Sequence, residues 1–100
     1  MTKEEQDIHF QEFVEEMLTV ITSKQADYAT NEDCLNNFKV AGANCGLTAE
    51  QQCLSLIATK VARLGVLLKS PNPKHESIRD SVLDMANYSV KLDQLLSEKE

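Results

Sequence analysis

Apolar residues recur at helical spacing along the first stretch of the chain, from about Glu4 to Lys24. Because they repeat every three or four positions, they share one side of a helix. Glu12 and Glu15 fall on the opposite side, which predicts a solvated acidic surface rather than a metal pair. Glu16 and His9 lie nearer the apolar edge, where both a surface role and a site role stay open. The apolar positions of this predicted amphipathic helix are Phe10, Phe13, Val14, Met17, Val20 and Ile21.

Two further elements follow a loop over residues 29–33. A short helix is indicated from Cys34 to about Ala43 by the order of Leu35, Phe38, Val40 and Ala41, and it ends at Gly42 or in the turn after it. Thr48 and Gln51 have the spacing of a capping box, in which each side chain bonds the backbone of the other residue. This motif predicts the start of a long helix that runs from Ala49 to about Lys69.

The segment Ser70–Pro73 contains two prolines among short polar residues, which end the long helix and reverse the chain. The last helix, from about His75 to Ser97, is apolar over most of its circumference, so we expect several neighbours to bury it. Two long helices joined by a short turn pack antiparallel. The pattern therefore predicts one all-α domain over residues 1–100: a small helical bundle with a long N-terminal helix, a short helix and a C-terminal antiparallel helix pair.

A strip of acidic residues interrupts the apolar surface of the last helix. Glu76, Asp80 and Asp84 follow one another at i,i+4 spacing, and with Asn87 they occupy an arc of about 80°. Like charges at this spacing cost a helix about 0.2–0.5 kcal/mol per pair. The strip therefore indicates either a solvated face or a cation that gathers the carboxylates.

Lys60 lies in the middle of the apolar face of the preceding helix, and Arg63 lies at the edge of that face. Lys60 and Val82 stand at equal distances from Pro71, so an antiparallel pair places Lys60 at the height of Asp80 and Asp84. The interpretation as a structural ion pair stays open. The surplus of negative charge favours Mg²⁺ or Mn²⁺, with three cations left for phosphate oxygens. These are Lys24, Lys60 and Arg63.

Composition narrows the range of partners. The chain has 100 residues and a net charge of −6, which argues against nucleic acid as the main partner but permits a small phosphorylated ligand that arrives with a metal ion. The three cysteines lack metal-ligand spacing and fit reduced thiols. No apolar run is as long as the roughly 18 residues that are needed to span a bilayer. The first residues are acidic, whereas a signal peptide begins with a basic region. We expect a cytoplasmic protein without membrane contact that forms a homodimer or larger oligomer through its last helix.

Four segments in order resemble the phage and prophage family called nucleotide modification associated domain 1. They read KQADYA, NNFKVAG, KVARL and ESIRDSVLDMANY, and they span about Ser23 to Leu92. The resemblance implies substrate-binding roles for Asp27, Tyr28, Asn37, Asn87 and Tyr88, beside phosphate binding by the three cations and metal binding by Glu76, Asp80 and Asp84.

Thr59 departs from the family pattern, because it stands where the family usually has an aspartate before the lysine. The segment from Asp84 to Tyr88 is also similar to part of the all-α NTP pyrophosphatases of MazG type, although their paired acidic motifs are not cleanly present. These resemblances imply Mg²⁺-dependent nucleotide binding, or hydrolysis of a nucleoside triphosphate to the monophosphate, in phage nucleotide metabolism in the host cytoplasm. The alternative is a non-catalytic oligomeric phage protein that sequesters a nucleotide signal or inhibits a host defence protein.

Overall fold

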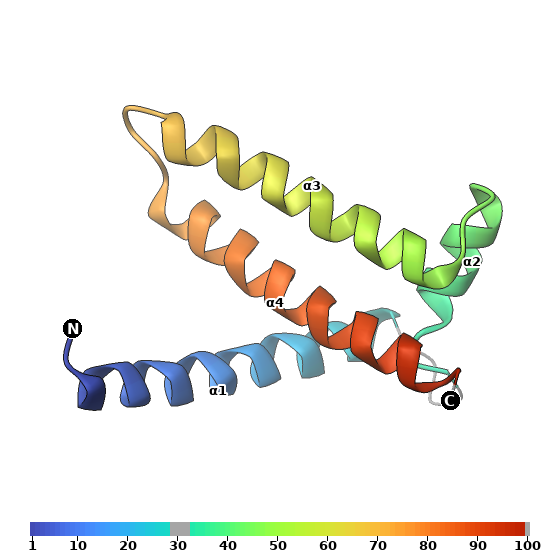
Figure 1. Ribbon diagram of the computed structural model, residues 1–100, viewed down its shortest axis with the longest axis horizontal. Coiled ribbons are helices and arrows are strands. Elements are labelled where there is room, and N and C mark those ends of the chain that lie inside the picture. Colours follow the sequence, from blue (N-terminus) through green and yellow to red (C-terminus); the bar gives the residue numbers. More distant parts are fainter. Residues whose placement is uncertain (29–32, 100) are drawn as a thin grey trace.

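The computed structural model describes residues 1–28 and 33–99, and the side chains of residues 24–28 lie outside this description. Within these limits the chain forms four helices and confirms the all-α prediction (Figure 1). The helices are α1 (Lys3–Tyr28), α2 (Asn36–Asn44), α3 (Ala49–Lys69) and α4 (His75–Ser97). Figure 1 shows α3 and α4 as an antiparallel pair, with α4 lying between α3 and α1.

The start of α3 has the predicted capping box. The backbone N–H of Gln51 donates to the Thr48 hydroxyl at 3.1 Å, and the backbone N–H of Thr48 donates to the Gln51 side chain at 2.9 Å. The two bonds satisfy backbone donors that a helix start otherwise leaves open. At the other end, Ser70 caps α3 and the two prolines lie in the turn before α4, as the sequence predicted.

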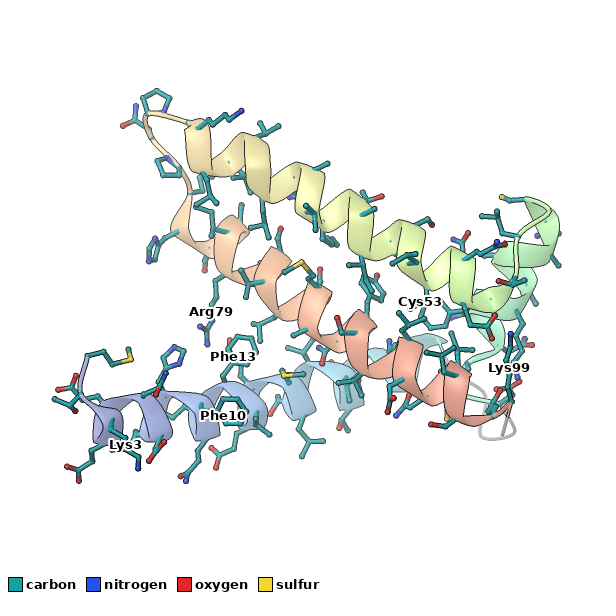
Figure 2. All side chains as sticks on the ribbon, in the orientation of Figure 1. Lys3, Phe10, Phe13, Cys53, Arg79 and Lys99 are labelled. Atoms are coloured by element: carbon teal, nitrogen blue, oxygen red, sulfur yellow. The ribbon has the colours of Figure 1, made fainter. Side chains whose placement is uncertain are left out.

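Helix α1 is longer than predicted, because it continues past Lys24 to Tyr28. No glycine or proline interrupts the segment between these residues, so nothing local ends the helix there. Arg79 of α4 holds α1 by an ion pair with Glu16 at 2.6 Å, and its guanidinium lies 4.9 Å from the centre of the Phe13 ring (Figure 2). Arg79 thus joins two helices, α1 and α4, that are far apart in the sequence.

The acidic face of α1 agrees with its prediction. Glu12 and Glu15 are exposed, which confirms their assignment to a solvated surface. The open question for His9 is answered by its surroundings: it is exposed, and its ring stacks on Phe13 at 6.4 Å between centroids. His9 is therefore a surface histidine.

The hydrophobic core lies where α2 packs across the start of α3 and the end of α4. Leu35, Phe38, Cys53 and Leu95 form its buried cluster. Lys39 reinforces this end, because its amine lies 2.8 Å from Asp33 and 3.1 Å from Glu98 at the end of α4. The bond from Lys39 holds the pKa of the Asp33 carboxyl below its usual value.

Gly42 packs against the backbone of the α2–α3 connection, where a side chain has no room. A Cβ atom at this position would lie 2.9 Å from the carbonyl oxygens of both Leu47 and Thr48. We therefore expect Gly42→Ala to lower the free energy of unfolding by about 1–3 kcal/mol, as overpacking does, although alanine favours helices. Urea denaturation followed by circular dichroism measures this change.

The exposed neighbour Ala43 provides the control for helix propensity alone. Ala43→Gly is expected to cost about 0.5–1 kcal/mol, the ordinary loss for a glycine in a helix. If Gly42→Ala were as stable as the wild-type chain or more so, the close approach of the two backbones at this position would be contradicted.

Candidate functional site

An ion pair joins the two long helices near the middle of their contact. The Lys60 amine of α3 lies 3.1 Å from a carboxylate oxygen of Asp84 on α4, and the two side chains are 25% and 19% exposed. The antiparallel pairing confirms that Lys60 reaches the height of the acidic strip. Since both groups are largely withdrawn from water, their charges interact more strongly than a fully exposed pair.

A hollow of about 220 Å³ adjoins this ion pair where α1 approaches α4. Its walls are formed by Val20 of α1 and by Asp80, Leu83 and Asp84 of α4. The site thus combines two carboxylates and two apolar side chains, with the Lys60 amine bound to one of the carboxylates. Such a mixture suits a small ligand that carries charge at one end.

The acidic strip is recessed only at its Asp84 end. Glu76 and Asp80 are exposed, whereas Asp84 is half-buried. Successive members of the strip are about 6 Å apart along the helix axis. A bound cation would therefore be needed to draw their carboxylates together. Among the described residues, no three His, Cys, Asp or Glu side chains are grouped to hold a metal ion.

Asn87 is a buried polar residue on the same side of α4. Its side chain is 5% exposed, and within the described part of the chain its Oδ1 atom accepts no hydrogen bond. Helical geometry places it one turn beyond Leu83 and Asp84, inside the arc that contains Asp80. An orphaned buried acceptor is costly, because it has lost water without gaining a donor.

The other predicted site residues are not all brought together. Arg63 is exposed on α3, one turn beyond Lys60. The Tyr88 ring meets Phe38 edge-on at 6.2 Å between centroids, so it belongs to the core cluster. Asn37 is exposed on α2, beside the core at the far end of the helix pair. The predictions for Lys24, Asp27 and Tyr28 concern side chains that lie outside the described residues.

The cysteines do not contribute a reactive group to this site. All three are free thiols; Cys34 and Cys45 are exposed and Cys53 is buried. Burial raises the pKa of the Cys53 thiol, and its Sγ donates to the backbone oxygen of Tyr88 at 3.3 Å. A thiol held in this state is a poor nucleophile.

Sequence reasoning missed the contribution of α1 to the site. Val20 forms a wall of the hollow, and Arg79 fixes the position of α1 through Glu16 and Phe13. The only signal in the sequence was Arg79, a basic residue next to the acidic strip. Its partner Glu16 lies 63 positions earlier in the chain. The role of Arg79 depends on how α1 returns across α4, which spacing alone does not reveal.

Within the described ranges, no helix combines the length and the hydropathy that a membrane span requires. Comparison of the chain with models of protein families, with curated proteins and with solved structures finds no match.

Proposed function

We propose that this chain binds a nucleotide through its phosphate groups, together with Mg²⁺ or Mn²⁺, at the hollow beside the Lys60–Asp84 ion pair. The observation that carries this proposal is that two carboxylates line one hollow and that one of them, Asp84, is paired with the half-buried Lys60. The choice of a nucleotide as ligand rests on the four segments that resemble nucleotide modification associated domain 1.

The carboxylates suit the chemistry of the metal. Mg²⁺ in nucleotide sites is usually held by one or two carboxylates, with water and substrate phosphates completing its octahedral coordination. Asp80 and Asp84 line the hollow and would supply such a pair. The exposed Glu76, one turn before Asp80, would then reach the metal only through water.

The cations suit the phosphates. The ammonium group of Lys60 has three donors, of which one is directed to Asp84, so the others are available to phosphate oxygens. Arg63 stands one turn further along α3, and its planar guanidinium would bind a phosphate through two parallel bonds. A bound metal would relieve the negative charge that the phosphates bring next to Asp80 and Asp84.

Asn87 supports a polar ligand near the same place. Its buried Oδ1 is an acceptor that would pair with a donor such as an amino group of a base or a hydroxyl group of a sugar. Ionised phosphate groups carry no hydrogen-bond donor. The Asn87 Oδ1 atom therefore suits the base or the sugar of a nucleotide rather than its phosphates.

The test is isothermal titration with nucleoside and deoxynucleoside triphosphates in the presence of Mg²⁺. We expect binding by the wild-type chain and an affinity about tenfold lower or worse for Asp80→Asn, because one charged metal ligand is lost. Asp80 is exposed, so the same substitution should leave the urea midpoint almost unchanged.

Asp93→Asn provides the matched control. Asp93 is exposed on the opposite side of the same helix, so its neutralisation removes equal charge without touching the hollow. The proposal is wrong if no triphosphate binds with Mg²⁺, or if the two variants weaken binding equally.

Binding without hydrolysis is favoured by Thr59. Its hydroxyl donates to the Ser55 backbone oxygen at 2.9 Å and is exposed, where the resembling family has an aspartate. A chain with this residue suits sequestration of a nucleotide, or inhibition of a host protein, better than cleavage. Product analysis after long incubation with Mg²⁺ separates the two activities, since released pyrophosphate indicates an enzyme and intact nucleotide indicates sequestration.

A further inference from the structure

The outer side of α3 carries an apolar stripe that nothing in the described chain covers. Its members recur at alternating intervals of four and three residues, which is the heptad spacing of helices that pair along their length. All five are exposed, and the three large ones are 55%, 55% and 68% exposed. The α3 stripe consists of Leu54, Ala58, Val61, Gly65 and Leu68.

The surroundings of the stripe are unusually poor in charge for an exposed helix. Between Glu50 and Lys69 the only charged residues are Lys60 and Arg63. Lys60 is directed to α4, and Arg63 lies on the side of the helix opposite the stripe. A surface helix is ordinarily polar on the side away from the core, so this side of α3 has the composition of an interface.

Gly65 is not explained by contacts within the chain. A Cβ atom at this position would meet nothing within 4 Å, so any residue fits there. Glycine inside a helix is less favourable than alanine, and its usual justification is the close approach of another backbone. In the described chain no backbone approaches Gly65.

The chain as a whole exposes more surface than a compact domain of its mass. The chain exposes 7389 Å², whereas a compact monomer of 11.2 kDa exposes about 5,700 Å². The radius of gyration is 15.4 Å, against about 13 Å for a compact domain of this length. The excess of about 1,700 Å² exceeds the about 800 Å² that each chain buries in a standard interface.

The stripe is complementary to itself when two copies run antiparallel. If the two-fold axis passes at the height between Thr59 and Lys60, Leu54 faces the partner's Gly65 and Val61 faces the partner's Ala58. Two of the three large residues, Leu54 and Val61, then oppose small ones, whereas Leu68 lies beside the partner's Gln51. Each contact occurs twice, as a two-fold interface requires.

The same register brings opposite charges together at the two ends of the stripe. Lys69 lies beside the partner's Glu50, whose side chain is 17% exposed and also pairs with Lys99 of its own chain at 3.3 Å. The C-terminal end of one helix lies beside the N-terminal end of the other. Surface ion pairs of this kind add little affinity, but they disfavour the parallel arrangement, which would place like charges together.

We propose that the chain forms a homodimer in which the α3 stripes of two copies pack antiparallel, with Leu54 against the partner's Gly65. The proposed interface lies on α3, whereas the sequence pattern predicted an interface on the last helix. In the structure the last helix, α4, packs against α3 and α1 of its own chain. The proposed interface leaves the hollow between α1 and α4 open, so the dimer is independent of the proposed nucleotide binding.

Sedimentation equilibrium of the full chain tests this dimer. The wild type should have twice the mass of the 11.2 kDa chain in the micromolar range. Gly65→Leu should raise the dissociation constant by about a hundredfold, as the loss of a central interface contact does, while circular dichroism shows unchanged helix content. Thr59→Leu, at an exposed position of α3 away from the stripe, should leave the dimer intact.

A compensating double substitution tests the register. When Leu54→Ala is combined with Gly65→Leu, the small residue stands at position 54 and the large one at position 65. The large residue of this pair of positions then again faces a small residue of the partner, so the double variant should restore the dimer. Positions 54 and 65 are about 16 Å apart within one helix, so restoration cannot arise inside a single chain. A monomeric wild type, a dimer unaffected by Gly65→Leu, or a double variant that stays monomeric would each overturn the proposed pairing.

Discussion

Leu95→Ala is expected to remove a large part of the stability of the fold, lowering the free energy of unfolding by about 2–5 kcal/mol. Leu95 is 2% exposed and packs in the buried cluster that joins α2, α3 and α4. Domains have only about 5–15 kcal/mol in total, and this chain buries few large side chains. Loss of Leu95 therefore threatens the folded state itself.

Urea denaturation followed by far-UV circular dichroism measures this loss. The neighbouring Leu96 is 49% exposed, so Leu96→Ala serves as a matched control and should change the free energy of unfolding by less than about 0.5 kcal/mol. Equal midpoints for the two variants would show that the core does not lie at this end of the helix pair.

The limits of α3 and α4 were predictable because the signals that set them are local. A capping box and a proline-containing turn act within a few residues, whatever the rest of the chain does. The end of α1 was predicted too early because this helix has no local stop signal. No such signal stands between Lys24 and Tyr28, and the loss of apolar periodicity there was not enough to end the helix.

The Lys60–Asp84 ion pair was predictable, whereas the Glu16–Arg79 pair was not. Counting outward from a short turn fixes which residues of an antiparallel pair share a height, so Lys60 could be matched to the acidic strip. Glu16 and Arg79 belong to helices joined by a long connection. Their pairing depends on the path of α1 over α4, which periodicity does not determine.

The burial of α4, predicted from its apolar circumference, was overestimated for a related reason. An apolar circumference predicts that α4 is surrounded, but it does not say how far the surrounding helices extend. Glu76 and Asp80 remain exposed, while Asp84 is covered where Lys60 reaches across. Apolar surface also stays uncovered on the other long helices, including Phe10 and Leu18 of α1 and the α3 stripe.

Asn87→Leu is expected to stabilise the chain and to abolish tight ligand binding. Leucine has nearly the branched shape of asparagine but no acceptor, so the change removes the cost of a buried Oδ1 without a donor. That cost is about 1–3 kcal/mol, and the free energy of unfolding should rise by a similar amount. Natural chains retain such costs where a polar group serves a ligand.

Paired measurements on one protein preparation check both effects. Urea denaturation gives the stability, and isothermal titration with the triphosphate that the wild type binds gives the affinity. Gln94→Leu makes a similar change of amide to alkyl at an exposed position of α4, and it should alter neither quantity. If Asn87→Leu were less stable and still bound the triphosphate, the Asn87 amide would be a structural group. A stable variant that no longer binds would instead place Asn87 among the residues that contact the ligand.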